Sequence, residues 1–407
     1  MPAPQIVVAP DSFKGSLSAS RVADAIARGL QHGWPGASVR CVPMADGGEG
    51  TVAAMLAATG GERRLATVSG PLGKPVTAVW GLLPGGWAVV ELAEAAGLPL
   101  LADAERDAGR ACTHGVGELI RAALDAGASR ILLALGGSAT TDGGAGMLRA
   151  LGARLLDAEG QPVPPGGAAL ASLRRLDLSG LDPRLKTATL EVACDVDNPL
   201  CGERGAAAVF GPQKGATPAE VAELDEALAH WAGMVAAATG QDRRDEPGAG
   251  AAGGAAFGAL VLGGALVPGV DRVAQWVGLP RALAGADWVL TGEGRLDAQT
   301  LGGKVPAGVL RLARERGVPV VAICGSLAPG YEALYEEGLA AAFSLVPGPA
   351  TLEQACAEAE GWLERRARDV SRLLAAGSRG HLSQTATEGV ASSPESCDDP
   401  ASQPMRA

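Results

Sequence analysis

The stretch "ATVSGPLGKPVTAVWGLLPGGWAVVELA", residues 66–93, differs in pattern from the segments on either side of it. Its apolar runs are short, rich in Val, Leu and Trp, and separated by glycine and proline turn signals. The sequence "LPGG" at 83–86 joins two of these runs, which predicts a β-hairpin. This stretch therefore predicts antiparallel strands, whereas the segments on both sides predict strands that alternate with helices.

The alternating pattern contains two strands before this stretch and three after it. The predicted strands are "QIVVAP" (5–10), "ASVRCVPMA" (37–45), "DWVLTG" (287–292), "VPVVAICG" (318–325) and "AAFSLVP" (341–347). A long final helix is expected over 351–376. Five β/α units are the number found in a flavodoxin-like, doubly wound parallel domain.

The fold class is therefore α/β, with one domain inserted in another. We expect a discontinuous flavodoxin-like first domain of residues 1–66 plus 286–378. A second α/β domain, residues 67–285, is inserted in it and combines the antiparallel strands with glycine-rich loops. Residues 379–407 are rich in Ser, Pro and polar side chains, which predicts a disordered tail.

This arrangement brings two loops face to face. In the flavodoxin-like order 2-1-3-4-5, strands 1 and 3 flank the switch point at which ligands bind. The first strand ends in "APDSFKGS" (9–16) and the third in "TGEGRLDAQT" (291–300). Both loops should lie near the inserted domain, and clefts between domains are common ligand sites.

Composition excludes several classes of protein. The chain has 407 residues and a formal net charge of −11, with no basic stripe, so we expect no nucleic-acid partner. The uncharged stretch 247–270 is dominated by Gly and Ala, which favours a buried helix over a membrane span. Seven scattered cysteines without a CxxC pair predict a reducing compartment, and no signal peptide is visible, so we expect a cytoplasmic protein.

The loop "GGSATTDGGAGML" (136–148) lies between a predicted strand and a predicted helix. Glycines let backbone N–H groups converge, hydroxyls add donors, and a helix start favours an anion. The loop is thus a candidate phosphate cradle, although a tight turn in which Asp142 caps the helix is the alternative. The candidate residues are Gly136, Gly137, Ser138, Thr141, Gly143 and Gly144.

Three further strand-end loops carry charged side chains, at 45–51, 193–216 and 291–308. Carboxylates there suit a magnesium site or a general base, and cations suit an anionic ligand. Helix caps, an Asx-Pro turn and structural ion pairs are the respective alternatives. The candidate residues are Asp46 and Glu49 in the first loop, Asp195 and Lys214 in the second, and Glu293, Arg295 and Asp297 in the third.

Phosphoryl transfer requires this set of groups, namely N–H cradles, one or two cations, carboxylates for Mg²⁺ and a base near the acceptor hydroxyl. Two domains that close on the substrates would also exclude water. The residues alone therefore indicate a two-domain α/β enzyme that acts on a small anion, with a kinase as the leading candidate.

Six motifs in series resemble the bacterial glycerate kinase family, in the type whose first domain is flavodoxin-like. The motifs are "APDSFKGSLSA" (9–19), "ADGGEGT" (45–51), "GGSATTDGGAGM" (136–147), "CDVDNPL" (194–200), "FGPQKGA" (210–216) and "LTGEGRLDAQTLGGKVP" (290–306). The resemblance runs from about residue 4 to 376. It implies ATP-dependent, Mg²⁺-assisted phosphorylation of D-glycerate, mostly to 2-phosphoglycerate, in the breakdown of glycolate, glyoxylate or sugar acids.

With this resemblance, each candidate residue receives an expected role. The expected catalytic residues are Asp195, which takes the hydroxyl proton, and Lys14 and Arg295, which hold the glycerate carboxylate. The expected Mg²⁺ ligands are Asp46 with Glu49 or Asp297. Ser12, Lys214, Glu293 and the glycine-rich loop are expected to contact substrate or phosphate.

Three alternatives stay open at this point. A kinase for a related small hydroxy acid would share all of these motifs. A non-catalytic glycerate sensor would not need the full set of charged residues, which is intact here. An NAD-dependent dehydrogenase would require GxGxxG after the first strand, where this chain has "APDSFKG" (9–15).

Overall fold

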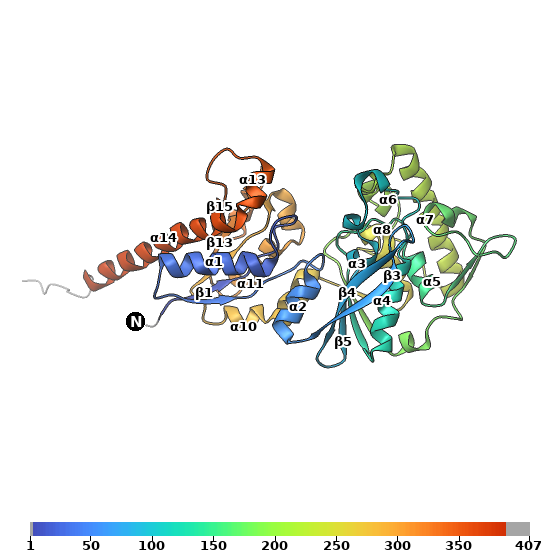
Figure 1. Cartoon of the computed structure of the whole chain (residues 1–407), viewed down its shortest axis with the longest axis horizontal. Coiled ribbons are helices and arrows are strands. Elements are labelled where there is room, and N and C mark those ends of the chain that lie inside the picture. The colour runs from blue at the N-terminus through green and yellow to red at the C-terminus, as the bar shows by residue number, and fades with distance from the viewer. Residues whose placement is uncertain (1–2, 388–407) are drawn as a thin grey trace, which may run out of the picture.

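Two β-sheets, one in each of two lobes, organise residues 3–387, which are the residues that the computed structural model describes (Figure 1). The first sheet has five strands, and every pair of neighbours is parallel. Its strands, in spatial order, are β2 (Ser38–Cys41), β1 (Gln5–Val8), β11 (Trp288–Thr291), β13 (Val320–Cys324) and β15 (Leu339–Ser344). This is the order 2-1-3-4-5, so the predicted flavodoxin-like sheet is confirmed.

Helices cover both faces of this sheet because its strands are apolar on both sides. The helices are α1 (Ala19–Gly33), α13 (Leu352–Ala357) and α14 (Ala359–Thr387), and then α9 (Gly269–Val277), α10 (Leu279–Leu283), α11 (Val305–Arg314) and α12 (Ala333–Glu336). Ile6 and Val8 pack with α1 and α14, whereas Val7 packs with α9 to α11 on the opposite face. Ser18 caps α1 by accepting a hydrogen bond from the backbone N–H of Arg21.

The second sheet has six strands and is mixed. Its strands, in spatial order, are β10 (Ala265–Val267), β9 (Thr189–Ala193), β6 (Arg130–Ala134), β5 (Trp87–Glu91), β4 (Pro75–Leu83) and β3 (Glu62–Ser69). β3, β4 and β5 pair antiparallel, and the remaining pairs are parallel. The predicted antiparallel stretch and its hairpin at 83–86 are therefore confirmed.

One face of the second sheet carries the main core of the inserted lobe. The helices of this lobe are α3 (Ala93–Ala96), α4 (His114–Asp125), α5 (Ala145–Ala150), α6 (Ala206–Phe210), α7 (Pro218–Thr239) and α8 (Ala251–Val261). The Gly/Ala-rich segment forms α8, and Ala255, Ala256 and Phe257 within it are fully buried, as expected of a core helix. Within residues 3–387, no helix is long and apolar enough to cross a membrane.

The other face of the second sheet is covered by α2 (Thr51–Thr59), which lies between the lobes (Figure 1), and by Trp276 at the end of α9. Val52 and Met55 of α2 pack against this sheet, and Trp276 of α9 meets Trp87 edge to face with ring centroids 5.4 Å apart. The boundary expected at residue 66 therefore lies earlier, before α2. The return to the first lobe likewise precedes 286, because α10 already packs on the first sheet.

The remaining elements are short, and the C-terminal helix differs from expectation. They are the β7 (Arg154–Leu156) and β8 (Arg175–Asp177) pair, the β12 (Arg295–Leu296) and β14 (Ser326–Leu327) pair, and 3₁₀ turns at Leu98–Leu100, Asp103–Glu105, Ala168–Ser172, Pro183–Lys186, Pro212–Lys214 and Ala298–Gly302. The single helix expected over 351–376 is two helices, and α14 continues to Thr387, past the expected start of the tail at 379. The rest of the tail, 388–407, lies outside the described residues.

Candidate active site

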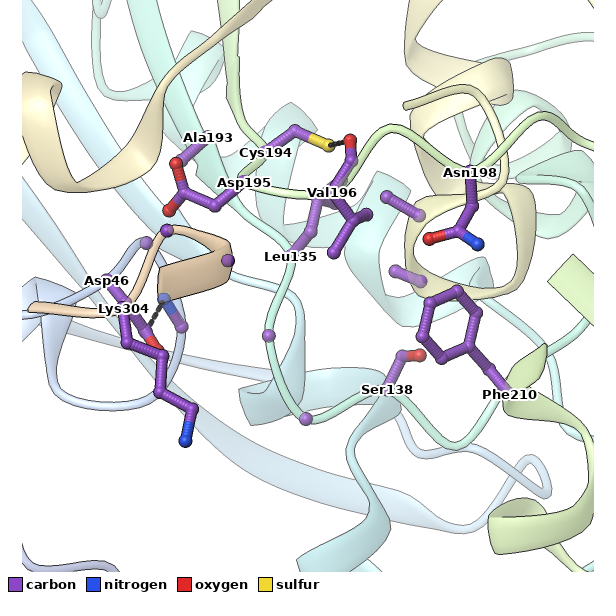
Figure 2. Close-up of a pocket in the computed structure, with 18 of the residues that line it drawn as sticks. Asp46, Leu135, Ser138, Ala193, Cys194, Asp195, Val196, Asn198, Phe210 and Lys304 are labelled. Atoms are coloured by element: carbon purple, nitrogen blue, oxygen red, sulfur yellow. Dashed lines mark hydrogen bonds between the residues drawn. The ribbon is translucent and has the colours of Figure 1, made fainter. Parts of the chain in front are cut away.

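A cavity of about 660 Å³ lies between the lobes, and we call it the interdomain cavity. The residues that line it include Asp46, Gly47, Gly48, Leu135, Gly136, Gly137, Ser138, Asp195, Val196, Asn198, Phe210, Lys214, Gly303 and Lys304. Figure 2 shows Asp46 and Lys304 close together at one end. Ser138, Asn198 and Phe210 lie at the other end.

The floor of the interdomain cavity is made of two glycine loops in contact. Gly136 and Gly137 follow β6, and Gly47 and Gly48 follow β2. A Cβ atom on Gly136 would lie 2.5 Å from the Cα atom of Gly48, so no larger residue fits there. The loops therefore offer backbone rather than side chains to a ligand, as a phosphate cradle requires.

A second cavity, of about 560 Å³, lies at the predicted switch point, and we call it the switch-point cavity. Its polar lining includes Asp11, Ser12, Lys14, Asp46, Glu293, Arg295 and Lys304. The backbone N–H of Asp11 donates to the carbonyl of Gly292 at 2.8 Å, which joins the end of β1 to the end of β11. The prediction that these two loops face each other is thus confirmed.

Asp46 and Lys304 line both cavities, so they form the wall between them. Lys304 Nζ lies 3.5 Å from Glu293 Oε2 and 3.4 Å from Asp297 Oδ1. Lys14 Nζ lies 3.9 Å from Asp46 Oδ2, and the charge of this carboxylate raises the pKa of Lys14. Cations and carboxylates from the loops after β1, β2 and β11, three neighbouring strands of the first sheet, therefore meet at one wall.

Asp195 occupies the interdomain cavity next to the start of α9. Its Oδ1 accepts a hydrogen bond of 2.8 Å from the backbone N–H of Gly269, and its Oδ2 accepts one of 3.3 Å from Val270. Burial raises the pKa of Asp195 to about 7, and the nearby charge of Asp46 contributes further. A carboxyl with such a pKa is suited to proton transfer near neutral pH.

Asp11 is a functional candidate that the sequence reasoning missed. Its side chain is 4% exposed, and burial raises its pKa to about 7, followed by the charge of Asp46. Its Oδ1 accepts a hydrogen bond of 2.7 Å from the backbone N–H of Ser12. The position of Asp11 in the sequence could have indicated it, because Asp11 lies just after a predicted strand in the same motif as Lys14.

Lys304, Asn198 and Phe210 were also absent from the predicted set, although all three line the interdomain cavity. Lys304 could have been selected as the lysine of the third charged loop. Phe210 carried no sequence signal beyond its place next to the "GPQK" turn at 211–214.

The structure brings together most of the predicted residues but divides them between the cavities. Ser12, Lys14, Glu293 and Arg295 line the switch-point cavity, whereas Gly136, Gly137, Ser138, Asp195 and Lys214 line the interdomain cavity. Lys214 is fully buried, its Nζ donates to the carbonyl of Thr140 at 2.6 Å, and burial lowers its pKa to about 7.

Three predicted cradle residues, Thr141, Gly143 and Gly144, line neither cavity. Gly143 accepts a hydrogen bond of 3.0 Å from Trp231 Nε1 at its carbonyl, and a Cβ atom there would strike the Trp231 ring. A Cβ atom on Gly144 would lie 2.7 Å from the Cα atom of Gly258. The second half of the glycine-rich loop therefore serves helix packing, and its first half, Gly136 to Ser138, lines the interdomain cavity.

The predicted magnesium set of Asp46, Glu49 and Asp297 is not assembled. Glu49 is exposed and outside both cavities, and Asp297 is paired with Lys304 and, at 3.3 Å, with Arg295. Among the side chains that the structure describes, those of residues 3–377, no group of three or more His, Cys, Asp or Glu is placed to hold a metal ion. Asp46 alone remains at the wall between the cavities.

The fold and the paired cavities define a two-lobed α/β protein in which two cavities are separated by one shared wall. The model of the glycerate kinase family matches residues 6–375. The chain belongs to the glycerate kinase family and is a kinase.

Individual relatives match over nearly their whole length. A "Glycerate kinase" of Bacillus subtilis strain 168 is 50% identical over 372 residues, 91% of this chain and 97% of the relative. A "Glycerate 2-kinase" of Escherichia coli K12 is 46% identical over 377 residues, 92% of this chain and 99% of the relative. A crystal structure provisionally assigned as glycerate kinase 2, from Salmonella typhimurium LT2, has a TM-score of 0.82 at 47% identity and covers 93% of this chain and all of the solved one.

Proposed function

We propose that this kinase transfers the γ-phosphoryl group of ATP to D-glycerate, giving 2-phosphoglycerate and ADP. The observation that carries the proposal is the shared wall of Asp46 and Lys304 between a glycine-floored cavity and a cavity lined with cations. Phosphoryl transfer depends mainly on position and charge, and two adjoining cavities supply both. The name of the Escherichia coli relative, "Glycerate 2-kinase", supports the choice of the 2-hydroxyl.

The cations would act on different parts of the reactants. The side chains of Lys14 and Arg295 are 61% and 68% exposed, so both are accessible to a carboxylate. Lys304 is held between two carboxylates at the wall, where charge develops on the transferred group. Lys214, buried beside the carbonyl of Thr140, would gain a counter-charge when a phosphate enters the interdomain cavity.

Magnesium would fit at Asp46. Kinases hold Mg²⁺ through one or two carboxylates plus substrate phosphates, so a cluster of three acidic residues is not required. Asp46 Oδ1 accepts a hydrogen bond of 3.0 Å from the backbone N–H of Gly48, and its Oδ2 points to Lys14 at 3.9 Å. The ion would neutralise charge on the β- and γ-phosphates when bound.

We place the reaction in the cytoplasm. The six described cysteines are all free, as expected in a reducing compartment. Burial raises the pKa of Cys112 and Cys324 to about 12, which keeps these thiols protonated and unreactive.

The test is a coupled assay of ADP release with MgATP and D-glycerate, with L-glycerate, tartronate and a longer aldonate as alternative acceptors. Turnover should require D-glycerate, and phosphorus NMR should show 2-phosphoglycerate. Turnover with tartronate or the aldonate but not with D-glycerate would show that the substrate is a different hydroxy acid. A rise in the unfolding temperature with glycerate but no ADP release would show that the protein binds glycerate without phosphorylating it, as a sensor would.

A further inference from the structure

We infer that the two ligands are divided between the cavities, with ATP in the interdomain cavity and glycerate in the switch-point cavity, and that Asp11 is the catalytic residue that contacts the accepting hydroxyl. This inference rests on the proposed function, since it assigns places to the two reactants of that reaction. It replaces Asp195, which the sequence favoured as the base.

The interdomain cavity has the two ends that a nucleotide needs. The end away from Asp46 and Lys304 has the ring of Phe210 beside the polar groups of Ser138 and Asn198, and the apolar side chains of Leu135 and Val196 lie between the two ends (Figure 2). An aromatic ring beside hydrogen-bonding groups suits a base, which binds by stacking and through its polar edge. Gly47 and Gly48 directly follow Asp46, Gly136 and Gly137 directly precede Ser138, and Gly48 meets Gly136, so the glycine loops connect the two ends and phosphates bound on them would reach Lys304.

The switch-point cavity instead concentrates cations and a free hydroxyl at its polar end. Lys14 comes from the β1 loop and Arg295 from the β11 loop, so two cations from facing loops border one space. Ser12 Oγ is buried, and no described residue gives it a hydrogen-bond partner. A buried unpartnered hydroxyl is costly, and the carboxylate or hydroxyl of a bound hydroxy acid would satisfy it.

The hydrogen bonds of the two candidate carboxylates distinguish them as proton acceptors. Both oxygens of Asp195 already accept backbone N–H groups at the start of α9. Only Oδ1 of Asp11 has such a bond among residues 3–387, which leaves Oδ2 available in the switch-point cavity. The elevated pKa of Asp11, caused first by burial and then by Asp46 and moderated by Lys14, agrees with this role.

In the resulting step, the proton of the glycerate 2-hydroxyl passes to Asp11 Oδ2. The hydroxyl oxygen forms a bond to the γ-phosphorus, and the bond from that phosphorus to the β–γ bridging oxygen breaks. ADP leaves with that electron pair, and the transferred group passes along the wall formed by Asp46 and Lys304. The proton is released from Asp11 after the product departs.

The test separates ligand placement from turnover. Calorimetry measures binding of D-glycerate and of a non-hydrolysable ATP analogue to Lys14→Met, Phe210→Ala and the control Lys74→Met, whose lysine pairs with Glu105 outside both cavities. Lys14→Met should weaken glycerate about 10- to 100-fold and the analogue less than about threefold. Phe210→Ala should show the reverse, with about tenfold weaker analogue binding. The opposite pattern, or an equal loss of affinity for both ligands in each variant, would contradict the assignment of ATP and glycerate to separate cavities.

Asp11 is tested with Asp11→Asn, with Asp157→Asn in an exposed turn outside both cavities as the matched control and Asp195→Asn as the rival base. Asp11→Asn should lower kcat about 100- to 10,000-fold with both dissociation constants within about threefold of wild type. Asp157→Asn should retain the wild-type kcat, and Asp195→Asn should lower kcat less than Asp11→Asn does. A kcat loss confined to Asp195→Asn would return the role to Asp195. Wild-type protein without ADP release would instead refute the proposed function, so the two failures are distinguishable.

Discussion

Lys304 Nζ lies 3.5 Å from Glu293 Oε2 in the wall that the two cavities share. Lys304→Met should therefore lower kcat about 100- to 1000-fold, because a cation at this wall acts on charge that develops during transfer. The KM values of both substrates should change less than about threefold. Steady-state kinetics measures both, with the exposed Lys186→Met as control. A raised KM at unchanged kcat would show that Lys304 binds ground-state substrate instead.

Gly253 is required by its surroundings, whereas Gly233 is not. Gly253 has a φ of +67°, and a Cβ atom there would lie 1.8 Å from the carbonyl oxygen of Thr140. Gly253→Ala should lower the free energy of unfolding by more than about 3 kcal/mol, since both backbone strain and overpacking contribute. A Cβ atom on Gly233, in the middle of α7, would meet only Arg244 Nη2 at 3.9 Å, an ordinary van der Waals contact, so Gly233→Ala should raise that free energy by about 1 kcal/mol. Urea unfolding measures both, and a stable Gly253→Ala protein would contradict the packing.

Asp142 holds the glycine-rich loop to the start of α4. Its Oδ2 accepts hydrogen bonds of 2.9 Å from both the backbone N–H and the hydroxyl of Thr113, and further backbone N–H groups come from Gly144 and Gly146. Asp142→Asn should lower the free energy of unfolding by about 1–3 kcal/mol, because the amide nitrogen cannot accept these bonds.

The matched control is Asp157→Asn in an exposed turn. Asp157 Oδ1 accepts hydrogen bonds from the backbone N–H groups of Glu159 and Gln161, and the oxygen of an asparagine can accept both of them. This variant should stay within about 0.5 kcal/mol of wild type in the same urea titration. Equal effects at the two positions would show that the buried network is not what stabilises the loop.

Glu91 should make stability depend on pH. Burial raises its pKa to about 7 from an ordinary value of 4.5, with Glu94 and Glu49 as the charged neighbours that add to the rise. Between pH 4.5 and 7 the folded chain keeps a proton that the unfolded chain has released, so this group lowers stability as the pH rises through that range.

Glu91→Gln keeps an acceptor for the backbone N–H of Val52 but removes the charge. Its free energy of unfolding, relative to wild type, should therefore increase from pH 4.5 to 7 and level off above. Thermal unfolding at several pH values measures this, with the exposed Glu353→Gln as control. A difference that does not vary with pH would contradict a buried, protonated Glu91.

The order of the first sheet could be predicted because each strand is a short apolar run with its own turn signals. The lobe boundary could not, since α2 has the sequence "TVAAMLAAT" (51–59), which indicates a helix but not the sheet it will cover. The packing of Val52 and Met55 in one buried cluster with Trp87 and Val89, residues of the second sheet, decides that question.

The site was predictable to the level of loops and not of single residues. Gly137, Gly143 and Gly144 all have positive φ values and belong to one motif. Gly143 differs from Gly137 because Trp231 of α7 packs on it, and the sequence does not show that Trp231 lies next to Gly143 in the fold. Asp11 and Asp195 likewise look alike in sequence, and they differ through the backbone N–H groups that each receives.

The pairing of β1 with β11, which sets Val7 opposite Val289, fixes an order of events during synthesis. The ribosome completes the entire inserted lobe, through β10 at Ala265–Val267, before any chain that can close the first sheet has been made. Contacts between residues far apart in sequence, such as those of β1 with β11, form slowly, whereas the strands of the inserted lobe pair with strands closer in sequence. Lys14 and Arg295 therefore meet only at the end of this process, and a nascent chain that stops short of β11 has glycine loops for a phosphate but no completed cavity for an acceptor.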